Sequence, residues 1–129
     1  MNYIYYDYSK SEACMIYPDQ IRCQKATSLK AFISRICIEN GSTLDGRKEA
    51  FKELIQVRKF IPILVHVNLL LIPIDDMWVN YFSISKVENN KLIFKDSTFI
   101  EISNPARIIN TKHRILRYLY LIEKAQNEY

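Results

Sequence analysis

Both glycines of the 129-residue chain lie in one short segment, at Gly41 and Gly46, and Arg47 and Lys48 follow the second glycine directly. A G-x-x-x-x-G spacing before a lysine is typical of loops that bind nucleotide phosphates. Such a loop continues with Lys and then Ser or Thr, because the hydroxyl must reach Mg²⁺. No hydroxyl residue follows Lys48. The segment therefore does not predict nucleotide hydrolysis, and a more general anion-binding role stays open.

The basic pair occupies the first turn of a predicted helix, which is an unusual place for cations. Gly41 permits a positive φ in the turn before that helix, and Gly46 permits a close backbone approach in its first turn. The amino-terminal end of a helix already carries partial positive charge, so two cations there are disfavoured unless an anion lies nearby. Two interpretations follow: Arg47 and Lys48 form a solvated surface without a function, or they contact a phosphate or another anion.

Three helices are predicted around this segment. Ser42 and Asp45 form a capping pattern, and the apolar periodicity that follows predicts a helix from about Thr43 to Gln56. A second apolar stripe favours a helix over Leu29–Ile38, which becomes strand-like near its end. An Asn-Pro pair at 104–105 is a natural start for a last helix, whose apolar stripe extends to Ile122.

Short apolar and aromatic segments predict strands between these helices. They are Tyr3–Tyr8, Ala13–Tyr17, Ile21–Cys23, Ile61–Val67, Leu69–Ile74, one longer strand from Trp78 to Val87, Leu92–Lys95 and Thr98–Ile102. Pro18–Asp19 is good turn chemistry for a hairpin, and further turn residues separate the later strands. We therefore predict a single domain over residues 1–129 of the α+β class, an antiparallel β-meander with a central helix and a C-terminal helix.

Composition excludes several classes of protein. Hydrophobic residues make up 49% and charged residues 25% of the chain, which is typical of a globular domain and not of a disordered one. The net charge of +4 permits an anionic partner. The longest apolar stretch, Phe60–Ile74, contains two prolines, His66 and Asn68, so we expect no membrane span.

The residues that could hold metals or act as nucleophiles are scattered. Cys14, Cys23 and Cys37 form no C-x-x-C pair, and His66 and His113 are isolated. Zinc sites need close pairs of such ligands, so no metal or other cofactor is predicted. We interpret the cysteines as small buried apolar residues in a reducing cytoplasm. No catalytic arrangement of Ser, His, Asp or Cys is visible, and the sequence does not predict an enzyme.

The stretch SRICIENGSTLDGRKEA, Ser34–Ala50, resembles the central signature of the ComK family, the competence transcription factors of Gram-positive bacteria. That signature has a Cys-containing segment, then Gly-Ser, and then Gly-Arg-Lys at the start of a helix. Later segments resemble the family in the same order, namely KFIPILV, LLLIPIDD, MWVNYFSISKV and NKLIFKDSTFIEIS. The resemblance covers roughly Tyr17–Leu121.

The resemblance implies a cytoplasmic DNA-binding transcription regulator of competence type that recognises promoters with paired A/T boxes, largely through the minor groove. Expected partners are double-stranded A/T-rich DNA and a second copy in a homodimer, with RNA polymerase as a further candidate; no membrane is expected.

Ile74, Met77, Asn80 and Tyr81 depart from the family pattern. Longer members carry a C-terminal extension linked to activation and proteolysis. The alternative is an interaction module that pairs with a full-length relative and blocks it.

The candidate DNA-binding residues are basic. Arg47 and Lys48 come first, because they match the family signature; we expect them at an exposed helix start, where their removal barely changes stability. The second group is Lys52, Arg58, Lys86, Arg107, Lys112, Arg114 and Arg117, although a basic helix face is also typical of a merely solvated surface. Asn80 could read a base edge, but a structural amide in a strand is the other interpretation.

Overall fold

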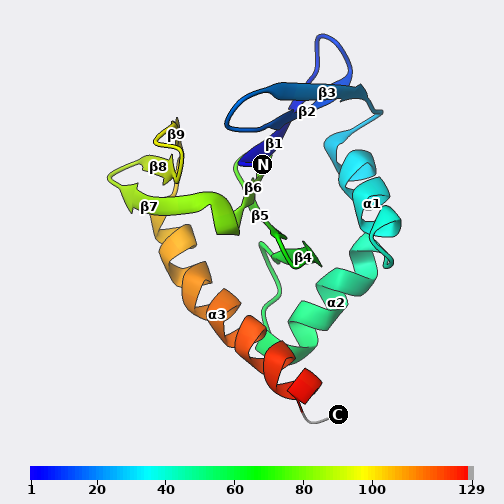
Figure 1. Ribbon diagram of the computed structural model, residues 1–129, viewed down its shortest axis with the longest axis vertical. Helices are drawn as coiled ribbons and strands as arrows, with labels where there is room; N and C mark the ends of the chain where they lie inside the picture. Colours follow the sequence, from blue (N-terminus) through cyan, green and yellow to red (C-terminus); the bar gives the residue numbers. More distant parts are fainter. Residues whose placement is uncertain (128–129) are drawn as a thin grey trace.

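A six-stranded antiparallel sheet forms the centre of the computed structural model, which describes residues 1–127. Its strands lie in the order β3-β2-β1-β6-β5-β4 (Figure 1). Their bounds are β1 Tyr3–Asp7, β2 Glu12–Ile16, β3 Ile21–Lys25, β4 Ile63–His66, β5 Leu69–Ile74 and β6 Met77–Asn80. The first strand of the chain therefore lies inside the sheet, where it pairs with β2 on one side and with β6 on the other.

A smaller antiparallel sheet and three helices complete the α+β fold that the sequence predicts. The sheet contains β7 Ile84–Glu88, β8 Lys91–Phe94 and β9 Phe99–Glu101, and the helices are α1 Leu29–Glu39, α2 Leu44–Ile55 and α3 Pro105–Asn127. The single long strand predicted from Trp78 to Val87 is wrong. A short 3₁₀ helix, η1 Tyr81–Ser83, separates β6 from β7, and these two strands belong to different sheets.

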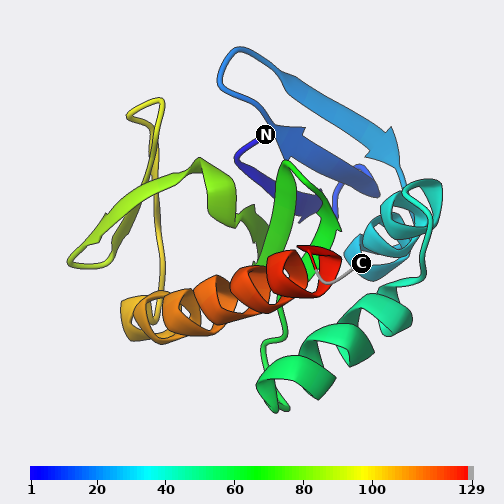
Figure 2. The same ribbon diagram turned by 60° about the horizontal axis from the view of Figure 1, so that its bottom comes forward.

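Two apolar cores lie on opposite faces of the six-stranded sheet. Leu69 and Leu71 of β5 pack in a cluster with Phe32 and Ile33 of α1, on one face. The alternating residues Leu70, Ile72 and Ile74 pack in a second cluster with α3 and β8, on the other face. Because successive side chains of a strand point to opposite faces, a strand covered on both sides must be apolar throughout. Figure 2 shows α3 lying across the front of the sheet, and Figure 1 shows α1 and α3 on opposite sides of it.

A third cluster joins α2 to α3. It contains Phe51 of α2, Ile61 of the following loop and Tyr118 of α3. The rings of Phe51 and Tyr118 are stacked, with their centroids 4.7 Å apart. The two helices meet at this cluster, which lies at the lower end of the molecule in Figure 1. Aromatic stacking therefore fixes the position of α2 relative to α3.

The cysteines differ from the prediction. Cys14 of β2 and Cys23 of β3 are direct cross-strand partners, with Cα atoms 4.1 Å apart, and form a disulfide bond, whereas Cys37 is free and buried. The expectation of three unpaired buried thiols is thus wrong for two of them. The reason is register: the turn at Pro18–Asp19, closed by a hydrogen bond from the Tyr17 amide to the Gln20 carbonyl, sets the two cysteines opposite each other.

Candidate nucleic-acid interface

The two glycines shape the start of α2. Gly41 has a φ of +98°, the left-handed region that side chains disfavour, in the turn after α1. At Gly46, an added Cβ would lie 2.9 Å from the Thr43 hydroxyl oxygen. That oxygen caps the helix by accepting a hydrogen bond from the Gly46 amide at 2.9 Å. The helix cap is therefore Thr43, one residue later than the pattern at Ser42 suggests, and both glycines have structural roles.

Arg47 points into the protein. Its guanidinium donates hydrogen bonds to the Leu64 carbonyl of β4 at 2.6 Å, to the Cys37 carbonyl at 3.1 Å and to the Asn40 carbonyl at 2.9 Å. Its Nε is buried and has no partner. The expectation that Arg47 lies at an exposed helix start is therefore wrong. Its side chain ties α2 to the end of α1 and to the edge strand β4.

The acceptors of Arg47 explain why a cation is tolerated in the first turn of a helix. Two of the three carbonyls belong to the carboxyl-terminal end of α1, at Cys37 and at the cap residue Asn40. That end of a helix carries partial negative charge. Partial negative charge on backbone carbonyls within the protein thus takes the place of the anion that the sequence pattern indicates. Burial raises the pKa of the Cys37 thiol, and the Arg47 guanidinium opposes part of that rise.

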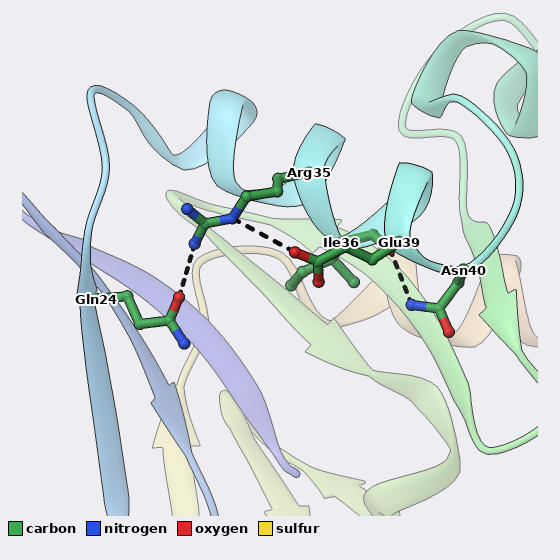
Figure 3. A network of polar contacts seen from close by, with 5 residues as sticks. All are labelled: Gln24, Arg35, Ile36, Glu39 and Asn40. Atoms are coloured by element: carbon green, nitrogen blue, oxygen red, sulfur yellow. Dashed lines mark hydrogen bonds and ion pairs between the residues drawn. The ribbon is translucent and has the colours of Figure 1, made fainter.

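A polar network holds the end of α1 in place for these contacts (Figure 3). The Arg35 guanidinium donates a hydrogen bond of 2.7 Å to the Gln24 side chain of β3 and lies 3.9 Å from the Glu39 carboxylate. The Asn40 amide donates to the Ile36 carbonyl at 2.8 Å. These exposed contacts connect α1 to the edge strand β3, and Asn40 in turn presents its own carbonyl to Arg47.

The remaining predicted residues of α2 and its following loop lie closer to solvent. Lys48 is half-buried, near enough to Cys37 to favour its thiolate. Lys52 pairs with Glu49 at 3.2 Å. Lys52 and Arg58 line one open groove of about 450 Å³, so the structure brings these two predicted residues together.

Arg107 lies beside the same loop. Its guanidinium carbon is 3.4 Å from the ring centroid of Phe60, a distance typical of cation–π stacking. Phe60 is 47% exposed and has a φ of +53°, which bulky residues rarely adopt. The stack connects the loop after α2 to the first turns of α3. Arg114 and Arg117 are exposed further along α3.

Lys86 and Lys112 belong to a different part of the surface. Both line a cleft between β7 and α3, away from the groove that contains Lys52 and Arg58. Lys112 precedes Arg114 by two residues, which corresponds to about 200° around a helix. The nine predicted residues are thus divided among a buried contact, a surface around the α2–β4 loop and α3, and this cleft.

The net charge of the protein is concentrated in α3. This helix contains five basic residues and one acidic residue, Glu123, whereas the rest of the chain has thirteen of each. The excess of +4 over the whole chain is therefore the excess carried by α3. Within residues 1–127, none of the basic residues of α3 forms an ion pair. The exposed part of α3 is thus an unneutralised cationic surface.

Asn80 is a structural amide. Its Oδ1 accepts hydrogen bonds from the amides of Leu70 and Phe82, each at 3.3 Å. Its Nδ2 donates to the Met1 carbonyl at 2.9 Å and to the Ser83 hydroxyl at 3.2 Å. The side chain is 4% exposed and therefore does not reach a ligand at the surface.

Comparison with known protein families, with curated proteins and with solved structures gave no match. In the part of the chain that the structure describes, no three His, Cys, Asp or Glu side chains are grouped so that they could hold a metal ion. The described helices also lack the combination of length and apolar character that crossing a membrane requires.

Proposed function

We propose that this protein is a non-enzymatic DNA-binding transcription regulator of competence type, which recognises A/T-rich promoter boxes largely through the minor groove. The resemblance to the ComK signature motivates the proposal. The observation that carries it is the concentration of the net positive charge in α3, without ion pairs among the described residues. A cationic, unneutralised surface is the electrostatic requirement for contact with DNA phosphates.

The dimensions of α3 suit a duplex. A helix of 23 residues is about 35 Å long, close to one turn of B-DNA. Arg114 and Arg117 are exposed three residues apart, so they lie on neighbouring parts of one face. We assign them, together with Arg107 and Lys52, to phosphate contacts. Arg58 lies on an exposed loop and is the candidate for insertion into a narrow A/T minor groove.

The test is fluorescence anisotropy with an A/T-rich and a G/C-rich duplex over a range of salt concentrations. With about four to six phosphates engaged, the logarithm of affinity should fall with a slope of about −4 to −5 against the logarithm of salt. In the double variant Arg114→Ala/Arg117→Ala the slope should become shallower by about 2. The control Lys10→Ala/Lys30→Ala removes the same charge from other exposed positions and should leave the slope unchanged. Equal effects of both variants would contradict the proposal.

Groove choice is tested separately. A minor-groove drug should compete with the protein for the A/T-rich duplex, and methylation of major-groove positions should have little effect. The reverse result would indicate that α3 enters the major groove. The Arg58→Ala variant should reduce the preference for A/T over G/C, whereas Lys52→Ala should weaken both duplexes alike.

A function on DNA implies a cytoplasmic location, which we also propose. Thiols in that compartment are normally kept reduced. The disulfide between Cys14 and Cys23 is then expected to exchange with the thiol pool. Alkylation in intact cells, followed by electrophoresis without reductant, measures the oxidised fraction.

An exposed apolar stripe on α3 favours self-association as part of this function. Leu116 and Tyr120 are 48% and 62% exposed, and their spacing of four residues places them along one side of the helix. We propose that this stripe forms the interface of the homodimer that paired boxes require, or of a pair with a full-length relative. Light scattering of the protein and of Leu116→Glu, with and without DNA, tests this; a wild-type monomer in both conditions would contradict it.

A further inference from the structure

A cleft of about 470 Å³ lies between β7 with η1 on one side and the first turns of α3 on the other. Its apolar lining comes from Phe82, Ile84 and Val87 on the first side and from Ile108 and Ile109 on α3. Ile108 is almost fully buried, and Ile109 is 57% exposed, so the cleft extends from the core to the surface. A volume of this size is typical of sites for small organic ligands.

An irregularity in β7 creates the wall of this cleft. Ile84 pairs with Phe94, but Lys86 pairs with Ile93, so Ser85 is an extra residue without a partner in β8. In a regular strand, neighbouring residues point to opposite faces. The extra residue interrupts this alternation, and the four consecutive residues from Ile84 to Val87 all border the cleft. Bulges that re-aim side chains in this way are common beside binding sites.

Three lysines also border the cleft, namely Lys86, Lys95 and Lys112. Lys86 is paired with Glu88 at 2.7 Å. Lys95 and Lys112 form no ion pair with any residue in the described range 1–127. The Lys95 amide donates a hydrogen bond of 2.9 Å to the Ser83 carbonyl, which holds the end of β8 against η1. Two lysines that form no ion pair among the described residues therefore border an apolar cleft.

We propose that this cleft binds a small organic anion with one carboxylate or phosphate head group and an apolar body. The ammonium groups of Lys95 and Lys112 recognise the head group through charge-assisted hydrogen bonds. The apolar lining buries the body. A DNA phosphate requires no apolar wall, so we assign Lys112 to this ligand and not to the duplex, whereas Lys86 is already paired with Glu88. The experiments below contain no DNA, so their outcome does not depend on whether the proposed DNA binding is correct.

The first experiment compares head groups on one tail by isothermal titration calorimetry of the full chain. Decanoate should bind at least about tenfold more tightly than decanol, because the charged contacts are lost in the alcohol. Decyltrimethylammonium and inorganic phosphate should not bind, since one has the wrong charge and the other has no apolar body. Decyl phosphate, compared with decanoate, shows which head group is preferred. Equal binding of decanoate and decanol, or no binding of either anion, would overturn the proposal.

The second experiment assigns the site. In Lys95→Gln/Lys112→Gln the affinity for decanoate should fall about tenfold or more, whereas Lys10→Gln/Lys30→Gln, with the same change in net charge, should stay within about twofold. Ser85→Phe should block the cleft while leaving the head-group lysines in place. Circular dichroism establishes that each variant is folded. Unchanged affinity for decanoate in the folded lysine variant would refute the proposed site.

Discussion

Replacing Arg47 by alanine should destabilise the protein, although its position in a helix start suggests a solvated cation. The variant loses three hydrogen bonds from one guanidinium to carbonyls of Cys37, Asn40 and Leu64. Hydrogen bonds that involve a charged group contribute about 1.5–3 kcal/mol each when they are buried. The contributions of the three hydrogen bonds do not simply add, because the Asn40 contact is exposed and the Cys37 carbonyl also accepts hydrogen bonds from backbone amides.

The Leu64 bond is the shortest of the three and is partly buried, and we assign to it about 1.5–3 kcal/mol. The two contacts at the end of α1 add about 0.3–1 kcal/mol as a cation at a helix carboxyl terminus. The expected loss in the free energy of unfolding is therefore about 2–4 kcal/mol. That loss is smaller than the free energy of unfolding of about 5–15 kcal/mol that is typical of small domains, so Arg47→Ala should still fold.

Equilibrium unfolding in urea, followed by circular dichroism, measures this loss as a lower midpoint with an unchanged slope. Arg47→Lys keeps the charge but not the planar fork, and it should fall between the wild type and Arg47→Ala. Lys48→Ala is the matched control and should change stability by less than about 0.5 kcal/mol. If Arg47→Ala is as stable as Lys48→Ala, the reasoning from these contacts is refuted.

Four further outcomes are expected. Asn80→Ala should lower the free energy of unfolding in urea by about 2–4 kcal/mol, since buried backbone groups lose their partner; an unchanged midpoint contradicts this. At pH 8, Cys37 should react with a thiol reagent far more slowly in the native protein than in urea, because burial raises the pKa of its thiol and keeps the reagent away from it. Equal reaction rates in the two conditions would contradict this prediction. Reduction of the Cys14–Cys23 bond should cost up to about 2–3 kcal/mol of stability, measured as a shift of the urea midpoint, and no shift disproves a stabilising role. Gly46→Val should lower the melting temperature, because its side chain meets the Thr43 cap, and a wild-type melting temperature would show that the cap can move.

The helices could be predicted because their signals are local. Apolar spacing, the capping pattern just before α2 and the Asn104–Pro105 pair at the start of α3 lie within a few residues of the structure they specify. The β-hairpin at Pro18–Asp19 could be predicted for the same reason, because its turn residues are local. The break in the strand after Asn80 was not, because the Asn80 side chain caps η1 and competes with the strand preference of its apolar neighbours.

The candidate site depends on contacts between distant segments, and these were not predictable. The sequence indicates that an anion should accompany Arg47, but backbone carbonyls of α1 and β4 take its place. The cleft beside α3 exists because of an extra residue in β7, which spacing alone does not reveal. The concentration of charge in the last helix, by contrast, can be counted from the sequence once the helix bounds are known.

The central position of β1 has a consequence for synthesis on the ribosome. Tyr3 and Ile4 pair with Val79 and Trp78. The backbone hydrogen bonds along both sides of β1 can therefore form only after residues up to β6 have been synthesised. Until then the hairpins of β1, β2 and β3 form an incomplete sheet with an open edge, a recognised template for aggregation. Pairing across such a long sequence separation is also slow. A nascent chain of this protein should therefore depend on chaperones until β6 emerges from the exit tunnel.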